Sequence, residues 1–479
     1  MNVAMVMLAL FLPAACGYGL WQWLLGRPRG CFAQCAAIGT GYLAGAVGFG
    51  WVLTWFDGVA TPILFGSVAV WLAVVAIAIG ATGMRWAPDL IGATRAAQPS
   101  SAQERWIIGL TVVLLALTGL LILQQAIALP SLSWDAWNAW LAKSKAWYYV
   151  GSFVEAQSLE AWRDAPAGTS ITTTAWIYPE ALPRFAVWLA SASGGWNEWA
   201  VHAAWPLAWA ALGLACFGYL GLAGCRTLPA LLTAAAILAL PLITAHAALA
   251  GYADLWLAAL LMIVGFHLLR WFQHRSSRDA LAAVLLAGLL LAVKLEGAVW
   301  LACLVAAVGL ALLPPRWRWG VLLAGPLLFA VALPFGGLRL PLPGLGVVRF
   351  DWGLIEIPTH GAMNLTWRPV LDEVMQALFL LPNWSLLWYL APIVLVLRWR
   401  ALRSARELKA LGGFLALGYS FLFVLFFLTD ASAWAENFTS INRVLMQIVP
   451  ITVVWLSLLW AAPTRLDPVP RDRSPSTAG

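Results

Sequence analysis

Charged residues in this sequence stand beside long apolar stretches rather than inside them. The ones that could do chemistry there are Asp135, Glu180, Arg184, Asp254, Lys294, Glu296, Asp430 and Arg443. A carboxylate at such a position can take a proton from a hydroxyl group, and a lysine or arginine can neutralise a phosphate. An ion-coupled transporter normally needs carboxylates or histidines at the membrane midplane, and the interiors of the apolar stretches hold almost none. The pattern therefore favours a catalytic cavity where the apolar stretches end.

Asp135 is the first candidate for a general base. It lies between Trp134 and Trp137 just after an apolar stretch. A carboxylate partly removed from water holds a proton more readily, as a general base requires. Asp is also a good residue to cap a helix that begins at Ala136. The sequence fits both interpretations equally well.

The other charged candidates also have structural alternatives. Glu180 could sit in the first turn of a helix, where the helix dipole favours a negative charge, and Asp254 could cap a helix. Lys294 and Glu296 could mark a tight turn at the membrane interface, although Lys294 could equally neutralise a phosphate. Arg443 could simply reach the interface along its own aliphatic chain.

The five histidines show no spacing typical of a metal site. His202 and His246 are expected to lie at the interface or to pack between helices, and His360 is a weak candidate for the substrate site. No cofactor is expected, because the ligand spacing does not support a divalent metal.

The elements that must position these residues are membrane-spanning helices. Hydrophobic residues make up 62% of the 479-residue chain and charged residues only 10%, whereas a soluble domain carries about 25% charged residues. The 31 Trp residues fit the membrane class, because indole rings favour the membrane interface. Basic cytoplasmic loops explain the net charge of +7, so nucleic acid is not an expected partner.

A helix needs about 20 apolar residues to cross the hydrocarbon core. About thirteen stretches qualify, near residues 3–25, 33–55, 62–83, 107–128, 199–222, 228–247, 253–272, 279–294, 297–313, 320–336, 383–398, 411–429 and 444–462. The expected fold class is therefore an all-α polytopic membrane protein. An outside N-terminus puts most Lys and Arg residues on the inside, so the positive-inside rule predicts that orientation and a cytoplasmic C-terminus.

Two predicted outer loops, residues 129–198 and 337–382, are long enough to be functional. Between residues 136 and 150 aromatic residues recur at helical spacing while Lys143 and Lys145 take other positions, which predicts an amphipathic helix on the membrane surface. Residues 183–192 predict a second interfacial helix. The chain then divides into a three-span N-terminal addition (1–105), a core (106–336), the second outer loop (337–382), C-terminal spans (383–462) and a disordered cytoplasmic tail (463–479).

Together these features resemble the GT-C superfamily of integral-membrane glycosyltransferases, and in particular bacterial members related to protein mannosyltransferases and aminoarabinose transferases. The resemblance covers roughly residues 107–460 and leaves the first three spans without a role. It rests on an acidic residue at the start of a long first outer loop, on a tyrosine-proline segment within that loop, and on two motifs at later span ends. These are Asp135, Tyr178-Pro179-Glu180-Ala181-Leu182-Pro183, Gly251-Tyr252-Ala253-Asp254 and Lys294-Leu295-Glu296-Gly297.

The resemblance implies an inverting glycosyltransferase of the bacterial inner membrane. Its donor would be a sugar on a polyprenyl phosphate, and its acceptor a hydroxyl of a lipid, glycan or protein at the outer face. Asp135 would deprotonate that hydroxyl, while Lys294, Arg443 and Arg184 would hold the departing phosphate. Many members carry a second acidic residue directly after the first. Here Ala136 follows, which leaves Glu180 or Asp254 as the second carboxylate.

Other residues of these motifs and loops are expected to line the substrate site. They are Glu296, Tyr178, Trp137 and His360. Aromatic rings among them suit the faces of a sugar, and the apolar helices suit a prenyl chain and the surrounding membrane lipids.

Three alternatives remain open. An outer-leaflet polysaccharide polymerase or ligase would share the donor but rely on Arg and His residues of a late loop, such as Arg349, His360 and Arg368. A lipid or sugar transporter and a non-enzymatic assembly subunit are the other two. With Asp135 replaced by Asn, a transferase should lose turnover while still inserting and folding, whereas transport that persists would exclude the enzyme. Against a ligase, Arg349→Ala and Arg368→Ala should have mild effects.

Overall fold

The apolar stretches of the sequence form long helices in the computed structural model, which describes residues 2–56, 65–91, 101–332, 334, 336–342, 346–358 and 361–462. The first four are α1 (Val3–Leu25), α2 (Gly30–Val52), α3 (Phe65–Trp86) and α4 (Ala102–Ala128). The middle of the chain forms α9 (Ala204–Leu222), α10 (Thr227–Leu238), α11 (Pro241–Ala248), α12 (Asp254–His274), α13 (Ser277–Val293), α14 (Glu296–Leu312) and α15 (Pro315–Ala332). The last long helices are α17 (Leu387–Ser404), α18 (Arg406–Leu428) and α20 (Ile441–Ala461).

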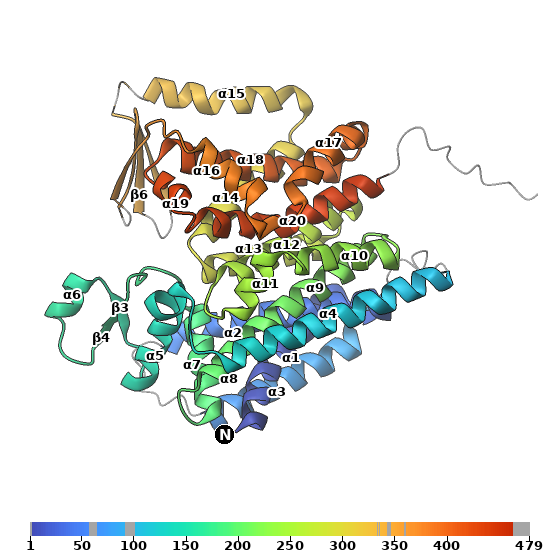
Figure 1. The fold of residues 1–479 in the computed structure, drawn as a ribbon, viewed down its shortest axis with the longest axis vertical. Helices are drawn as coiled ribbons and strands as arrows, with labels where there is room; N and C mark the ends of the chain where they lie inside the picture. The colour runs from blue at the N-terminus through green and yellow to red at the C-terminus, as the bar shows by residue number, and fades with distance from the viewer. Residues whose placement is uncertain are drawn as a thin grey trace, which may run out of the picture.

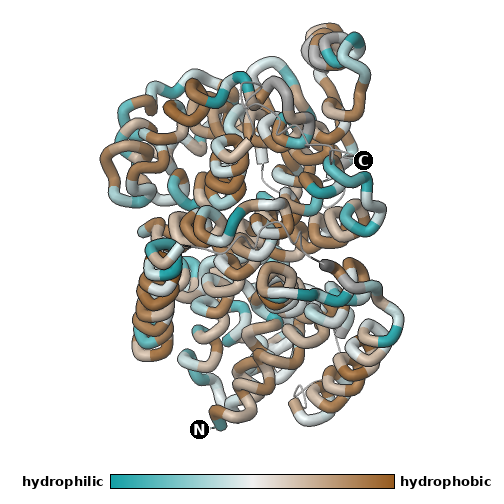
Figure 2. The backbone as a smooth tube through the Cα atoms, turned by 90° about the vertical axis from the view of Figure 1, so that its right-hand side faces the viewer, coloured by the Kyte–Doolittle hydropathy of each residue, from teal (hydrophilic) through white to brown (hydrophobic). Residues whose placement is uncertain are grey.

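A helix, or in one case a bent pair of helices, lies at each of the thirteen predicted stretches. Among the described residues, eight helices are long and apolar enough to cross a membrane: α1, α2, α3, α4, α9, α12, α18 and α20. The number is up to nine if α10 and α11, which meet at 64°, form one broken span. These helices fit an integral membrane protein, and Figure 2 shows hydrophobic residues, in brown, on many of the helical segments. Thirteen spans remain a prediction.

The connecting segments that carry the candidate site gather at one end of the helices. Residues 129–203 form α5 (Leu141–Val150), β3 (Glu155–Gln157), α6 (Leu159–Asp164), β4 (Ser170–Thr172), α7 (Ala181–Ser193) and α8 (Glu198–His202). Figure 1 shows α5, α6, β3 and β4 on the same side of the molecule as β6 of the second predicted loop. We call this end of the helices the loop side.

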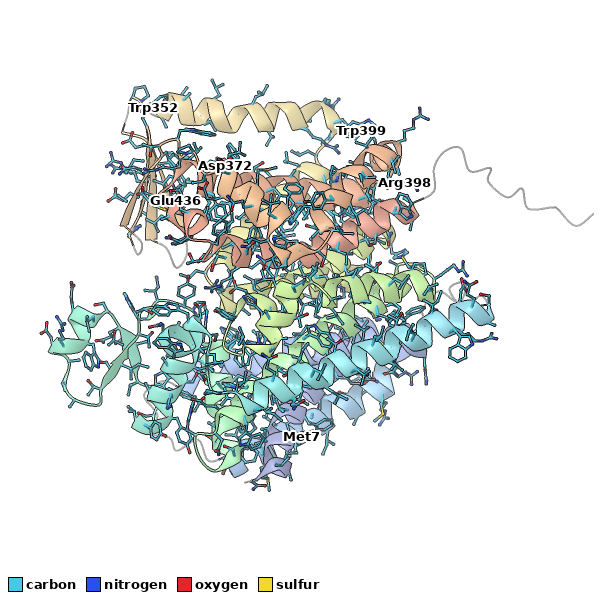
Figure 3. All side chains as sticks on the ribbon, in the orientation of Figure 1. Met7, Trp352, Asp372, Arg398, Trp399 and Glu436 are labelled. Carbon is cyan, nitrogen blue, oxygen red and sulfur yellow. The ribbon has the colours of Figure 1, made fainter. Side chains whose placement is uncertain are left out.

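The second predicted loop contains a sheet that the sequence patterns did not predict. Four antiparallel strands pair in chain order: β5 (Leu338–Leu342), β6 (Gly346–Asp351), β7 (Leu354–Ile357) and β8 (Gly361–Asn364). The short helices α16 (Leu371–Met375) and α19 (Ser432–Glu436) lie on the same side. Figure 3 labels Trp352, Asp372 and Glu436 there, whereas Arg398 and Trp399 of α17 lie at the opposite side. At that opposite end of α1 and α3, β1 (Arg27–Arg29) pairs in parallel with β2 (Asp89–Ile91).

Small residues let the N-terminal helices pack directly on the middle of the chain. A Cβ on Gly218 of α9 would lie 2.3 Å from the backbone nitrogen of Ala36 on α2, and one on Gly39 would lie 2.5 Å from the carbonyl oxygen of Ala211. Such close backbone approach is typical of helix pairs in membranes. The predicted three-span addition is thus held against the core through α2.

Helices form at both stretches predicted to be interfacial, but α7 and Lys143 are more buried in the protein than such helices would be. α7 is buried within the protein along nearly its whole length, between α1, α2 and α5. In the other, a π-helical turn over Ala136–Trp140 leads into α5. Lys143 of α5 is only 2% exposed, so its side chain faces the protein rather than water. Its amine donates hydrogen bonds to backbone carbonyl oxygens of the following loop.

Candidate active site

Three charged side chains from three separate helix ends meet in a buried cluster on the loop side. Asp254 is the first residue of α12, Lys294 follows the last residue of α13, and Arg443 lies in the first turn of α20. Lys294 Nζ lies 2.8 Å from Asp254 Oδ1, and Arg443 Nη2 lies 3.1 Å from Asp254 Oδ2. Asp254 is fully buried and Lys294 is 4% exposed. Charges this deep persist only when they are paired, as these are.

Asp135 joins the cluster through the same guanidinium. Arg443 Nη1 donates to Asp135 Oδ1 at 3.0 Å, and Arg443 Nη2 contacts Asp135 Oδ2. The planar guanidinium therefore binds Asp135 with two nitrogens while it also contacts Asp254. Asp135 precedes the turn at Ala136, but its side chain makes no capping hydrogen bond. The predicted helix cap is therefore absent, because the side chain pairs with Arg443 instead. The role of Asp135 as a general base stays a prediction.

Two glycines fix the close approach of the segments that carry these carboxylates. Gly251, before α12, has φ +109°, and a Cβ there would lie 2.4 Å from the Cβ of Ala136. Ser133 Oγ donates to the carbonyl oxygen of Ala250 at 2.8 Å. Gly297 lies against α13, where a Cβ would be 2.2 Å from the carbonyl oxygen of Leu290. Glycine at these positions allows the Asp135 segment and the α13–α14 turn to close on the cluster.

Glu296 extends the cluster from the first position of α14. Its Oε1 lies 2.9 Å from Lys294 Nζ, and its buried Oε2 has no hydrogen-bond partner among the described residues. Burial alone would lower the pKa of Lys294, but the carboxylates of Asp254 and Glu296 outweigh it and raise that pKa, so the amine stays charged. Lys294 and Glu296 thus form both the predicted tight turn and part of the charged cluster.

Tyr178 faces the same cluster from the first long loop. The negative charge of Glu296, followed by burial, raises the pKa of the Tyr178 phenol, so the phenol keeps its proton. Its ring packs edge-on against Trp140 with centroids 5.4 Å apart. On the other side, the ring of Tyr252 lies 4.7 Å from the guanidinium carbon of Arg443. These phenols offer hydrogen-bond donors beside the charged groups.

Sequence reasoning missed Gln447 as a residue of this cluster, and it expected His246 only at the interface or packed between helices. Gln447 lies one helical turn after Arg443, where its Nε2 donates to Asp254 Oδ1 at 2.6 Å and its Oε1 accepts from the indole of Trp300 at 2.7 Å. The sequence did contain a signal for this residue, because Gln447 is an amide in an otherwise apolar span and lies four residues after Arg443. His246 Nδ1 lies 2.9 Å from the carbonyl oxygen of Leu242. Its Nε2 is buried with no partner in the part of the chain that the structure describes.

Glu180 and Arg184 form a second cluster rather than joining the first. Arg184 Nη2 lies 2.6 Å from Glu180 Oε2, one turn away on α7. The guanidinium of Arg184 packs over Trp147 and Phe153, with its carbon 4.9 Å and 4.3 Å from the ring centroids. Arg184 is only 1% exposed, so its guanidinium is not accessible to a phosphate in this structure. Its role as a phosphate ligand stays a prediction.

Lys143 completes the second cluster. Its Nζ donates to the carbonyl oxygens of Trp176 and Tyr178 at 3.0 and 3.1 Å, and lies 3.7 Å from Glu180 Oε1. Burial, partly offset by Glu180, lowers the pKa of Lys143 to about 8. These contacts hold the loop that presents Tyr178 to the first cluster.

The remaining candidates lie elsewhere. Trp137 is 54% exposed and packs edge-on against Trp134. Arg349 pairs with Asp351 in the sheet and Arg368 pairs with Asp430, at 2.7 and 2.5 Å. His360 lies outside the described residues. The alternative late-loop site would depend on Arg349 and Arg368, and each of them pairs with a carboxylate that is not part of the Asp135–Asp254 cluster.

The first cluster combines the groups needed for proton transfer and for binding an anion. Three carboxylates (Asp135, Asp254 and Glu296) stand against two cations (Lys294 and Arg443), which gives a formal charge of −1. Glu296 Oε2 and His246 Nε2, which no other described residue engages, can accept a hydrogen bond. Within the described ranges, no group of three or more His, Cys, Asp and Glu residues is arranged to hold a metal ion.

Comparisons of the chain with protein-family models, with curated proteins and with solved structures gave no match.

Proposed function

We propose that this chain is a GT-C-like inverting glycosyltransferase that moves a sugar from a polyprenyl phosphate to an acceptor hydroxyl on the loop side. One observation carries the proposal. Asp135, from the first long loop, shares the guanidinium of Arg443 with the buried Asp254, beside Lys294 and Glu296. We place the loop side at the outer face of the bacterial inner membrane, with the N-terminus outside and the C-terminus in the cytoplasm.

The two cations of the cluster suit a phosphate leaving group. The donor is a phosphodiester with one negative charge, and the departing polyprenyl phosphate gains a second as the glycosidic bond breaks. Lys294 and Arg443, which meet at Asp254, would stabilise that growing charge. Phosphate leaves without protonation, so no general acid is required. The single carboxylate that acts as base is neutralised in the same step by the proton it accepts.

Arg443 would link donor binding to activation of the base. In the structure its guanidinium contacts both Asp135 and Asp254. A donor phosphate competes with Asp135 for the same nitrogens, because guanidinium binds phosphate and carboxylate with the same fork. Arg443 would then turn to the phosphate and Asp135 would be released. Asp254, held by Lys294 and Gln447 as well, would keep the arginine in place.

The transfer itself balances as follows. The acceptor O–H gives its proton to Asp135, and its oxygen forms a bond to the anomeric carbon from the face opposite the phosphate. The bond between the anomeric carbon and the phosphate oxygen breaks, and the electron pair leaves with the phosphate. The transition state has oxocarbenium character. Tyr178 and Glu296 Oε2, which has no hydrogen-bond partner among the described residues, would bind sugar hydroxyls.

Cells that lack this protein allow the proposal to be tested before the sugar is identified. Mass spectrometry of their lipids should reveal a polyprenyl phosphate sugar that accumulates, and expression of the chain should clear it. Asp135→Asn should leave the lipid uncleared at equal membrane abundance. Asp430→Asn is a matched control, because Asp430 is an exposed carboxylate paired with Arg368 outside the cluster. The absence of any accumulating lipid, or normal clearance by Asp135→Asn, would refute the proposal.

A further inference from the structure

Two buried polar atoms at the edge of the charged cluster have no hydrogen-bond partner among the described residues. They are Glu296 Oε2 and His246 Nε2. Glu296 contacts Lys294 through its other oxygen at 2.9 Å, and His246, which is 4% exposed, lies within electrostatic reach of Asp254 and Arg443. A buried polar atom without a partner is costly, and most such atoms in folded proteins are engaged. These two atoms are therefore candidates to engage a ligand.

The hydrogen-bonding character of His246 is fixed by its other ring nitrogen. Nδ1 lies 2.9 Å from the carbonyl oxygen of Leu242, one turn earlier on α11. A carbonyl oxygen only accepts, so Nδ1 carries the ring hydrogen, and Nε2 of the neutral ring is an acceptor. The free oxygen of the Glu296 carboxylate is an acceptor as well. Both atoms therefore need a ligand group that donates a hydrogen bond.

Tyr252 packs against both His246 and Arg443. Its ring lies 4.5 Å from the ring of His246, centroid to centroid, and 4.7 Å from the guanidinium carbon of Arg443. In the proposed function Arg443 turns from Asp135 to the phosphate of the sugar lipid, so Tyr252 loses the cation that its ring faces. The half-buried Tyr252 can then move off His246 and let the sugar reach Nε2.

The sugar attached to that phosphate comes close to both free acceptors. Lys294 and Arg443 are the cations proposed to hold the phosphate. Glu296 adjoins Lys294, while His246 adjoins Arg443 through Tyr252. A sugar hydroxyl donates to either acceptor, whereas a sugar carboxylate has no hydrogen to give and would meet the negative charge of Glu296. The two acceptors thus distinguish sugars by their substituents.

We propose that His246 and Glu296 select the transferred sugar, which presents one unsubstituted hydroxyl group to His246 Nε2 and another to Glu296 Oε2 and carries no carboxylate. This inference rests on the proposed function, because it takes the phosphate of the sugar lipid to lie at Lys294 and Arg443. His246 binds the sugar and takes no proton in the transfer, so the bonds that form and break are those already given.

Two substitutions of His246 separate hydrogen bonding from packing. In His246→Gln the amide oxygen reaches about as far as Nε2 and accepts in its place. The shorter side chain in His246→Asn still donates to Leu242 but does not reach the position of Nε2. His202 is the matched control, because it is 2% exposed and both its ring nitrogens have partners at 2.9 Å, the carbonyl oxygen of Ala126 and Ser131 Oγ. His202→Asn should therefore affect stability but not sugar binding.

The purified variants are compared with two lipids, the polyprenyl phosphate sugar that accumulates in cells lacking the protein and bare polyprenyl phosphate. His246→Asn should raise KM for the sugar lipid about tenfold at unchanged kcat, as expected for a hydrogen bond made equally in the ground and transition states. His246→Gln and His202→Asn should stay within about twofold of the wild type. The Kd of bare polyprenyl phosphate should be the same in all variants, because this lipid has no sugar.

Equal KM values for His246→Asn and His246→Gln would overturn the proposal, because the acceptor atom would then not matter. Weaker binding of bare polyprenyl phosphate by His246→Asn would overturn it as well, since His246 would then act through Tyr252 and Arg443. Mass spectrometry of the accumulated lipid gives an independent outcome. A sugar with free hydroxyl groups and no carboxyl group is expected, and a uronic acid would refute the selection.

Failure of the proposed function gives a different result. If Asp135→Asn turns over normally, or if the wild type binds neither lipid, glycosyl transfer itself is refuted and the sugar selection falls with it. If Asp135→Asn is inactive and the two His246 variants behave alike, the sugar selection is wrong and the proposed function survives.

Discussion

Lys294 and Asp254 form a buried ion pair whose loss should be strongly non-additive. Lys294 is 4% exposed and Asp254 fully buried, and their charged atoms lie 2.8 Å apart. Lys294→Met keeps the side-chain length and removes the charge, whereas Asp254→Asn keeps the volume and removes the negative charge. Each single substitution leaves a charge in a buried site, and the double substitution removes both charges of the pair.

The contacts around the pair set the size of the effect. Breaking a buried pair costs about 3–5 kcal/mol. Asp254 keeps Arg443 at 3.1 Å and Gln447 at 2.6 Å when Lys294 is lost, and Lys294 keeps Glu296 at 2.9 Å when Asp254 is lost. We therefore expect the low end, about 3 kcal/mol for each single variant. The double variant should lose about 3–4 kcal/mol, which gives a coupling energy of about 2–3 kcal/mol.

Unfolding of the purified chain in mixed micelles with increasing SDS measures these free energies. Arg226 and Glu104 provide a matched control pair, with atoms also 2.8 Å apart but side chains 53% and 24% exposed. Arg226→Met with Glu104→Gln should show a coupling energy below about 1 kcal/mol, as exposed pairs do. If the Lys294–Asp254 coupling is no larger than that of the control pair, the cluster is solvated and the argument for a buried, assembled site is wrong.

Three further substitutions test other parts of the structure. Gly251→Ala should lower the melting temperature in detergent and abolish activity. A φ of +109° alone costs a non-glycine residue about 1–3 kcal/mol, and the new Cβ would lie 2.4 Å from the Cβ of Ala136. An unchanged melting temperature would contradict the close approach. Gln447→Leu should lower the free energy of unfolding by about 2–4 kcal/mol, because Asp254 loses a hydrogen-bond donor and the Trp300 indole is left unpaired. A decrease no larger than that caused by replacing an exposed glutamine would argue against these contacts. Lys143 has a folded-state pKa of about 8, below its ordinary 10.5, so the folded state loses its proton first and stability should rise by about 3 kcal/mol from pH 8 to 10.5 relative to Lys143→Met. Parallel pH profiles of wild type and Lys143→Met melting would contradict the lowered pKa.

The convergence of Asp135, Asp254, Lys294 and Arg443 followed from the sequence because helix ends alternate between two sides of a membrane. Once the spans are placed by hydropathy, each charged residue at a span end is assigned to a side. Residues on one side can pair with one another, and unpaired charges at the edge of the hydrocarbon are costly, but Glu180, Arg184 and Asp430 pair elsewhere on that side. The side was therefore predictable, while the partner of each residue was not.

The interaction partner of each charged or polar residue depends on tertiary packing, which the periodicity of the sequence does not reveal. Lys143 occupies a position that the helical pattern assigns to solvent, yet carbonyl oxygens at Trp176 and Tyr178 draw it inward. Arg184 satisfies Glu180 locally, one turn away, and so does not reach the main cluster. In the sequence Gln447 is only a polar residue within an apolar span. Its hydrogen bonds to Asp254 and Trp300 become apparent only in the structure.

The sheet of the second predicted loop was missed for a different reason. Its strands are four to six residues long, and glycines such as Gly346, Gly353 and Gly361 adopt positive φ at or between them. Short strands with exposed faces give no clear alternation of apolar and polar residues. The strands are stabilised by cross-strand pairing, such as Arg349 opposite Glu356, which only the register reveals.

Single-turnover transfer by the purified chain tests the central claim most directly. The polyprenyl phosphate sugar that accumulates without the protein is mixed with excess enzyme and with lipids extracted from the same cells, and released polyprenyl phosphate is measured over time. We expect release with inversion at the anomeric carbon, and a rate about 10²–10⁴-fold lower for Asp135→Asn, the range expected for loss of a general base. Release at the wild-type rate by Asp135→Asn, or no release by the wild type, would contradict the account.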